Sequence, residues 1–113
     1  MEIQVYAAEQ AQEVQIVAIN GRIDAKTAIE IEDALNQLKD QGRVKIVIDF
    51  GQVNYISSGG LRVFLTALKW TKSGNGDLKL AQMENNVEKI FKLAGFTKIF
   101  NIFASLQEAV NAF

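Results

Sequence analysis

The sequence predicts a single α/β domain over residues 1–113, with a single-layer mixed sheet of about five strands and four helices in the order β-β-α-β-α-β-α-β-α. Two observations carry this prediction. Segments with helical and strand periodicity alternate through most of the chain, which is typical of a largely parallel sheet with right-handed crossovers. Two strand-like segments precede the first helix, which indicates an antiparallel pair. A chain of 113 residues suits one hydrophobic core rather than two.

Five short segments rich in β-branched and aromatic residues predict the strands. They are, in order, Ile3–Tyr6, Val14–Ile19, Val44–Ile48, Leu78–Ala81 and Lys98–Phe103. The third has almost no polar alternation, which suits a strand covered on both faces in the middle of the sheet, and Asp49 marks its end. The run Asn20-Gly21-Arg22-Ile23-Asp24 breaks the pattern between the second strand and the first helix.

Polar residues that can cap a helix predict where the helices begin. The predicted caps are Asp24, or Thr27 in a capping box with Glu30, for the first helix, Asn85 with Glu88 for the third, and Ser105 with Glu108 for the fourth, which reaches Phe113. The chain has no proline, so glycines and these caps must set the helix boundaries.

The helix after Ser57 has an uneven circumference when it is plotted at about 100° per residue. Its narrow polar stripe consists of Arg62, Thr66, Lys69 and Ser73, and its apolar arc consists of Leu61, Phe64, Leu65, Ala67 and Leu68. Val63 and Trp70 lie on the border between the two. They belong either to the core, as most apolar helix positions do, or to a partner-binding edge beside the basic stripe.

The composition limits the classes of function. The 12 basic and 13 acidic residues nearly cancel, so neither nucleic acid nor a membrane surface is expected as a partner. Histidine and cysteine are absent, which removes the commonest general base, the commonest metal ligand and the thiolate nucleophile. We therefore expect no metal, no cofactor and no enzymatic activity. No stretch suits a secretory signal or a membrane span, so the expected location is the cytoplasm.

The chain is organised around Asn54–Leu61, NYISSGGL. A buried strand here delivers two serines and two glycines to the start of a helix, where the backbone amides are unpaired and carry a partial positive charge. A hydroxyl or a phosphate is well accommodated at such a position. Ser58 is therefore either a simple N-cap residue or a functional hydroxyl, and Ser57 can equally be a cap or turn residue. The same amides can also cradle a nucleotide or another anion, although the chain has no Walker lysine and no G-x-G-x-x-G motif.

Three segments together form a recognisable signature. They are the strand that ends in Asp49-Phe50-Gly51 with the following Val53–Leu61, the run Gly21-Arg22-Ile23-Asp24 ahead of the first helix, and Val87–Phe96, VEKIFKLAGF. These segments resemble STAS domains, and specifically the stand-alone anti-sigma factor antagonists. The likeness spans nearly the whole chain, so it implies a single STAS-like domain.

In that family the loop reads aspartate, serine, serine, glycine, leucine, and the first serine accepts a phosphate from a partner anti-sigma kinase. On this chain the acceptor falls at Ser58 and the glycine at Gly60, whereas Ser57 stands at the aspartate and Gly59 at the second serine. The resemblance implies a regulator that binds an anti-sigma factor with serine kinase activity and is switched off by phosphorylation at Ser58, with Ser57 as second choice. It also allows a PP2C-type phosphatase as a partner.

The resemblance and the position of the loop together nominate a set of partner-binding residues. They are Asp24, Asn54, Ser57, Gly59, Gly60, Arg62 and Val63. Asp24 and Asp49 are either a carboxylate pair on the same rim as the serines or, more simply, a helix cap and a turn residue. Two alternatives stay open for the function: a STAS-type interaction without phosphorylation, and a nucleotide- or anion-binding module.

Overall fold

The computed structural model describes all residues from Met1 to Phe113 and confirms the predicted order of elements. Its single sheet has the strand order β1-β2-β3-β4-β5, with β1 antiparallel to β2 and the other pairs parallel. The strands are β1 (Glu2–Ala7), β2 (Gln15–Ile23), β3 (Lys45–Ile56), β4 (Asp77–Ala81) and β5 (Asn101–Phe103). The helices are α1 (Ala25–Asp40), α2 (Ser58–Ser73), α3 (Asn85–Leu93) and α4 (Leu106–Asn111), with a short 3-10 helix at Phe96–Lys98.

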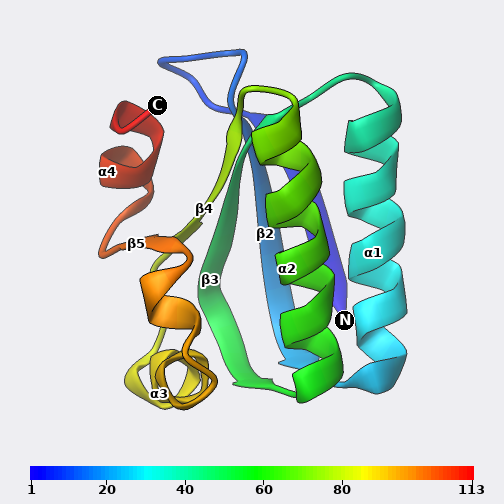
Figure 1. The fold of residues 1–113 in the computed structure, drawn as a ribbon, viewed down its shortest axis with the longest axis vertical. Helices are drawn as coiled ribbons and strands as arrows, with labels where there is room; N and C mark the ends of the chain where they lie inside the picture. The colour runs from blue at the N-terminus through cyan, green and yellow to red at the C-terminus, as the bar shows by residue number, and fades with distance from the viewer.

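The helices cover the two faces of the sheet unequally. α1 and α2 lie side by side over one face (Figure 1), and α3 closes the same core beside β3. α4 packs on the opposite face over β3, β4 and β5. Alternate residues of β3 serve the two sides, since Ile46 and Ile48 belong to the main core whereas Val47 packs towards α4. None of the helices is long and apolar enough to cross a membrane.

β3 is longer than the sequence predicted. It runs for 12 residues, Lys45–Ile56, instead of ending at Asp49. Compared with β2, it carries one extra residue between Asp49 and Gln52 and another between Val53 and Tyr55. Such bulges bend a strand without ending it, and β3 visibly changes direction in its lower half (Figure 1). The Asp-Phe-Gly segment therefore belongs to a bulged strand rather than to a turn.

Asp49 lies in the middle of the sheet rather than at the rim beside the serines. Its Oδ1 accepts hydrogen bonds from the Gly51 N–H at 2.8 Å and from Gln82 Nε2 at 2.7 Å. Seven strand positions separate it from Ile56, or roughly 20 Å at the usual rise. Asp24 follows the residue that pairs with Ile56. The alternative that paired Asp24 with Asp49 on one rim is therefore wrong.

α4 covers the start of β2 around Ile16, but it leaves the opposite face open over most of β1, the rest of β2 and the middle of β3. A shallow polar hollow lies there, lined by Glu2, Gln4, Tyr6, Ala18, Ile19, Asn20, Asp49 and Gln52. Partial burial and, to a smaller extent, the negative charge of Asp49 raise the pKa of the Tyr6 phenol. The Tyr6 hydroxyl therefore stays protonated, and able to donate a hydrogen bond, throughout the neutral pH range.

β2 also continues beyond its predicted end. It spans Gln15–Ile23 and passes through Gly21, whose φ of +128° lies in a region that favours glycine. The segment around Gly21 therefore belongs to the strand, and a shift in register against β3 falls at this point. As a result β2 and β3 end together, with Ile23 opposite Ile56, and a helix follows each of them almost at once.

The C-terminal third departs most from the prediction. α3 begins without a side-chain cap, so the predicted box of Asn85 with Glu88 is wrong. The predicted strand Lys98–Phe103 is shortened to β5 because the 3-10 helix comes before it. The cap at Ser105 is confirmed, but α4 ends at Asn111 rather than at Phe113.

Candidate functional site

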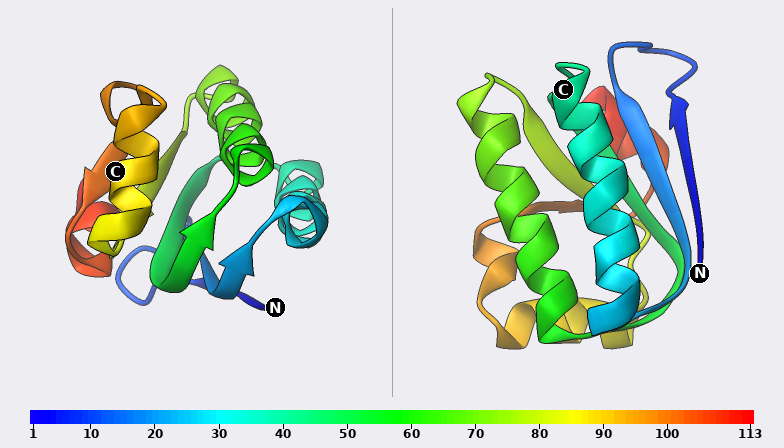
Figure 2. Two further views of the ribbon diagram at one scale, coloured as in Figure 1. Left: turned by 90° about the horizontal axis from the view of Figure 1, so that it is seen from below. Right: turned by 90° about the vertical axis from the view of Figure 1, so that its right-hand side faces the viewer.

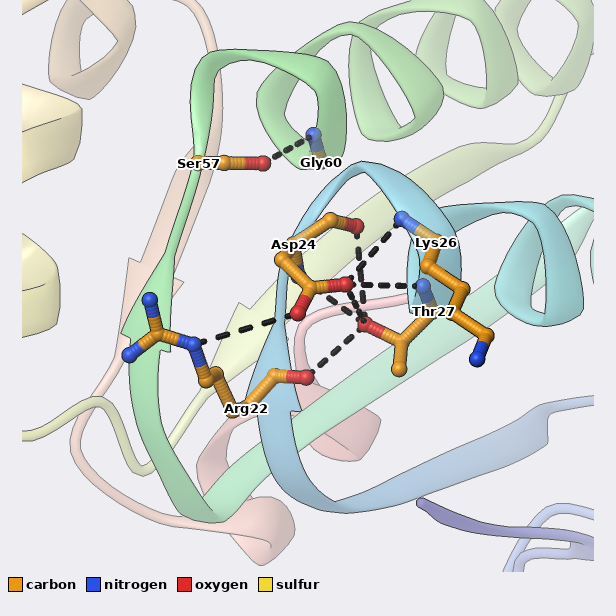
Figure 3. A network of polar contacts seen from close by, with 6 residues as sticks. All are labelled: Arg22, Asp24, Lys26, Thr27, Ser57 and Gly60. Atoms are coloured by element: carbon orange, nitrogen blue, oxygen red, sulfur yellow. Dashed lines mark hydrogen bonds and ion pairs between the residues drawn. The ribbon is translucent and has the colours of Figure 1, made fainter.

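The starts of α1 and α2 meet where β2 and β3 finish (Figure 3). The Ser57 N–H donates to the Ile23 carbonyl oxygen at 2.8 Å. The contact between β2 and the chain after β3 therefore extends to Ser57, the residue before α2. Ala25, the first residue of α1, lies beside Gly59 in α2. The loop that the sequence singled out is therefore held between two strand ends and the start of a neighbouring helix.

Ser57, and not Ser58, caps α2. The backbone of Ser57 is extended, and its Oγ accepts a hydrogen bond from the Gly60 N–H at 3.3 Å (Figure 3). This contact satisfies one of the amides that a helix start leaves unpaired, and a cap of this kind contributes about 0.5–2 kcal/mol. Of the two serines that could cap the helix, Ser57 takes this role and Ser58 does not.

Ser58 is the first residue of α2, and its side chain is exposed. Its hydroxyl makes no hydrogen bond within the chain. Arg62 lies one turn further along the same helix and is also exposed, a spacing at which side chains are neighbours on the helix surface. The structure thus leaves the Ser58 hydroxyl open to solvent, near a positive charge and at the positive end of the helix dipole.

The two glycines of the loop have different surroundings. Gly60 is buried, and a Cβ added to it would lie 2.6 Å from Ile23 Cγ2 and 2.9 Å from Ile56 Cγ1. A Cβ at Gly59 would meet Ser57 Oγ only at 3.7 Å, which is ordinary contact. Gly60 therefore lets α2 approach the strand ends closely, whereas Gly59 is half-buried and has room for a Cβ.

Asp24 caps α1. Its Oδ1 accepts hydrogen bonds from the backbone N–H groups of Lys26 and Thr27, each at 3.0 Å, and Thr27 Oγ1 accepts the Asp24 N–H at 2.9 Å (Figure 3). The predicted alternative with Thr27 as the N-cap residue is wrong. Arg22 Nε lies 3.8 Å from Asp24 Oδ2, an exposed contact that contributes little. The Arg22 guanidinium also lies 4.1 Å from the centre of the Tyr55 ring.

A groove of about 260 Å³ runs between α1 and α2 and begins beside the serine loop. It is lined by Ala25, Ala28, Ile29, Glu32, Gly59, Arg62, Val63 and Thr66. Ile29 is 60% exposed, which is unusual for a large apolar side chain. Ile29 was not among the predicted site residues, although the sequence carries a signal for it: Ile29 lies outside the buried stripe of α1 that Ala28 and Ile31 begin.

The structure brings most of the predicted partner-binding residues together. Gly59, Arg62 and Val63 line the groove, and Asp24 and Ser57 lie at the two helix starts beside it. Two predicted residues stand apart. Gly60 is buried under the helix. Asn54 lies towards α3, where its backbone carbonyl oxygen accepts a hydrogen bond from Asn86 Nδ2 at 2.8 Å.

The border residues of α2 occupy intermediate positions. The polar stripe is exposed along its whole length, as predicted, at Arg62, Thr66, Lys69 and Ser73. Val63 and Trp70 are half-buried and pack against the main core, and only Val63 also reaches the groove. Trp70 instead lies near the Lys39 ammonium, 6.0 Å from the ring centre.

Comparison with known proteins identifies the family. The family model for the STAS domain matches residues 6–109. The chain belongs to the STAS domain family. A protein of Bordetella bronchiseptica named as the anti-sigma factor antagonist BtrV is 34% identical, over 87% of this chain and 84% of its own length. The anti-sigma-B factor antagonist of Listeria monocytogenes is 29% identical, over 76% of this chain and 75% of its own length.

Solved structures share the STAS fold at low sequence identity. The anti-sigma factor antagonist SpoIIAA in its unphosphorylated form has a TM-score of 0.82 at 19% identity, covering 98% of this chain and 95% of that one. The Bacillus cell fate determinant SpoIIAA in its phosphorylated form has a TM-score of 0.74 at 18% identity, covering 98% of each chain. An anti-sigma factor antagonist from Mycobacterium paratuberculosis has a TM-score of 0.87 at 22% identity, covering 98% and 92%. The predicted STAS fold is confirmed.

The serine loop of this STAS domain differs from the pattern aspartate, serine, serine, glycine, leucine that the resemblance implied. The fold accommodates the differences. Ser57 stands at the aspartate position, and serine and aspartate are similarly good N-cap residues. The exchange therefore keeps the cap of α2 and removes a negative charge next to Ser58. Gly60 stands where the implied pattern has its glycine. The close approach of Ile23, which leaves no room for a Cβ at this position, explains why it needs a glycine.

The acid stability of this STAS domain should depend on Asp24. The Thr27 backbone N–H is the main cause that holds the pKa of Asp24 below its ordinary value. Burial opposes it, and the Thr27 hydroxyl, the Lys26 N–H and the charge of Arg22 each add a smaller lowering effect. Because the folded-state pKa is lowered, this stabilisation is present above the unfolded pKa, about 4, and is lost as pH falls through the folded value.

Asp24→Asn keeps a side-chain cap that does not titrate. We expect the urea midpoint of the wild type to fall more steeply than that of Asp24→Asn as the pH is lowered from about 5 to about 2. The other carboxylates contribute equally to both proteins, so the difference between the two curves isolates Asp24. Parallel curves would contradict the assignment.

Proposed function

We propose that this STAS domain protein is an anti-sigma factor antagonist that binds an anti-sigma factor with serine kinase activity and is released when Ser58 is phosphorylated. The observation that carries the proposal is the exposed Ser58 hydroxyl, which has no hydrogen-bond partner in the chain and stands at the start of α2 beside the groove. Curated relatives that match three quarters of the chain or more are named as such antagonists, which supports this class of partner. A PP2C-type phosphatase would restore the active form.

The groove between α1 and α2 supplies the partner surface in this proposal. Ile29 and Val63 provide apolar area, and Arg62 and Glu32 provide charged groups at its sides. A partly exposed apolar centre with a polar border is the usual composition of a protein interface. The arginine and the isoleucine are the side chains that we expect to contribute most to affinity.

Phosphorylation of Ser58 leaves the fold intact in this mechanism. A phosphate adds about −1.5 to −2 charges, at a helix N-terminus whose dipole favours negative charge and one turn before Arg62. The same fold is known in a phosphorylated neighbour, SpoIIAA. The partner interface responds differently, because a double negative charge at the edge of an apolar contact must be desolvated when the partner binds. The modification therefore weakens binding and preserves stability.

The test uses each anti-sigma factor with a serine-kinase domain that the native host encodes, purified and titrated with three forms of the chain. Ser58→Ala should bind like the wild type, and Ser58→Asp should bind at least about tenfold more weakly, or about 1.4 kcal/mol. The urea midpoints of all three should agree closely. If Ser58→Asp binds as tightly as the wild type, the phosphorylation switch is contradicted and only the interaction with the anti-sigma factor is retained.

Incubation with the same kinase and ATP identifies the acceptor. Ser57→Asp removes the competing hydroxyl and keeps the cap of α2, so it is the matched control for Ser58→Ala. Mass spectrometry should find one phosphate on the wild type and on Ser57→Asp, and none on Ser58→Ala. The reverse pattern would move the acceptor to Ser57, and no phosphate on any form would contradict the kinase part of the proposal.

A further inference from the structure

β1 is an unprotected edge of the sheet. It is the terminal strand, and the right-hand view of Figure 2 shows no other element along its outer side. Proteins usually protect such an edge with lysine, proline, a bulge or a very short strand. The opposite edge, β5, has only three residues. β1 has six, contains neither lysine nor proline, and pairs with β2 in unbroken register.

The side chains of β1 are also unusually exposed for their type. Val5 and Tyr6 are each 43% exposed, and they are two of the six large apolar side chains of the chain that are exposed. Val5 pairs with Val17, which belongs to the core below α1, so it lies on the helix-covered face. Tyr6 lies on the other face, in the polar hollow with Gln4. Both faces of the strand therefore carry apolar surface that nothing in the chain covers.

We propose that β1 is the interface through which two copies of this chain associate, with the two β1 strands pairing antiparallel about a two-fold axis at Gln4. The outward N–H and C=O groups of each strand then pair with those of the other copy, and the two sheets join into one. This inference concerns a surface separate from the serine loop, and it does not depend on the proposed function.

The sequence of β1 is self-complementary in this register. A two-fold axis perpendicular to the sheet places the helix-covered faces of both copies on the same side. Residues directly opposite each other must therefore point to the same face of the joined sheet. An axis at Gln4 puts Ile3 opposite Val5 of the other copy, both on the helix-covered face, and Glu2 opposite Tyr6. Apolar meets apolar on one face, and on the other a carboxylate meets a phenol that can donate to it.

Charge also favours this arrangement. Glu2 is the only charged residue of β1, and the antiparallel pairing places the two Glu2 carboxylates at opposite ends of the joined strands. An axis at Val5 instead would leave Glu2 without an opposite residue in β1. The axis at Gln4 is therefore the register that pairs every apolar and every charged side chain of Glu2–Tyr6.

The dimer leaves both groove surfaces accessible. α1 lies between β1 and α2 (Figure 2), so the groove and the serine loop are on the far side of α1 from the new interface. Six-residue strand edges bury less area than a permanent dimer needs, so the association is weak and depends on concentration.

Sedimentation equilibrium from about 10 µM to about 1 mM protein tests the association. The mean mass of the wild type should rise towards the dimer with concentration. Gln4→Lys places two like charges directly opposite each other on the axis, and it should remain monomeric with an unchanged urea midpoint. Gln37→Lys, the same exchange at an exposed position of α1, should associate like the wild type. A wild type that stays monomeric throughout, or a Gln4→Lys variant that dimerises equally well, would overturn the proposal.

The register is tested with single cysteines, because the chain has none of its own. Directly opposite residues of antiparallel strands have Cβ atoms about 4.5–5.5 Å apart, close enough for a disulfide after a small adjustment. Gln4→Cys should form a covalent dimer under mild oxidation at least about tenfold faster than Leu93→Cys, an exposed position on α3. Equal rates for the two variants would overturn the axis at Gln4.

Discussion

Replacing Gly60 with alanine is expected to destabilise the protein by about 1–3 kcal/mol, because the new methyl group has no space. It would lie 2.6 Å from Ile23 Cγ2 and 2.9 Å from Ile56 Cγ1, and both isoleucines are fully buried at the ends of β2 and β3. α2 would have to move away from the strand ends, which would also stretch the hydrogen bond between Ser57 Oγ and the Gly60 N–H. Urea unfolding measures the loss.

Gly59→Ala is the matched control, one residue earlier in the same helix turn. The added methyl group meets only ordinary contacts, and the φ of Gly59 is not in the left-handed region. We expect this variant to be stabilised by about 0.4–1 kcal/mol, because alanine loses less chain entropy than glycine when the helix forms. Equal effects of the two exchanges would contradict the assignment of Gly60 as the close contact and Gly59 as the position with room for a methyl group.

The sequence predicted well those features that follow from local chemistry. The exposed stripe of α2 follows directly from the spacing of Arg62, Thr66 and Lys69, since helical periodicity fixes which positions share a face. The Asp24 cap is likewise a local contact between a carboxylate and amides two and three residues later. Features of this kind are decided within one turn of helix, so the sequence contains the information that they need.

The length of β3 could not be read in the same way. Asp49 and Gly51 have the composition of a turn, but their strand is held extended by neighbours from distant parts of the chain. Asp49 accepts a hydrogen bond from Gln82, which is 33 positions away. The bulges are set by pairing with β2, and nothing local specifies them. Tertiary pairing therefore overrides the local preference for a turn.

The choice between the two serines depended on the same error. With Asp49 as the predicted end of the strand, either Ser57 or Ser58 could be the N-cap residue. The actual strand end at Ile56 places Ser57 in the cap position and Ser58 in the first turn. The free hydroxyl at Ser58 is thus a consequence of where β3 ends, which explains why the sequence alone could not separate a cap from an accessible acceptor.

Replacing Phe50 with alanine is expected to cause the largest loss of stability, about 3–5 kcal/mol. The side chain is fully buried beside the first bulge of β3. Its ring centre lies 5.3 Å from that of Phe64 in α2 and 5.8 Å from that of Phe91 in α3, both in edge-on geometry. Edge-on aromatic pairs add about 0.5–1.5 kcal/mol to the effect of burial. One side chain therefore joins the bulged strand to two helices, and alanine leaves a cavity among all three.

Ile29→Ala is the control that separates stability from recognition. Ile29 is mostly exposed in the groove, so its truncation should change the free energy of unfolding by no more than about 0.5 kcal/mol, and it should weaken binding of the anti-sigma factor if the groove is the partner surface.

For Phe50→Ala, we also expect the hydrogen-exchange protection of α3 to fall more than that of α1, because α3 loses an aromatic contact while α1 makes none with Phe50. A loss of less than about 1 kcal/mol in the free energy of unfolding of Phe50→Ala would mean that the bulge is held by its backbone pairing rather than by the aromatic cluster.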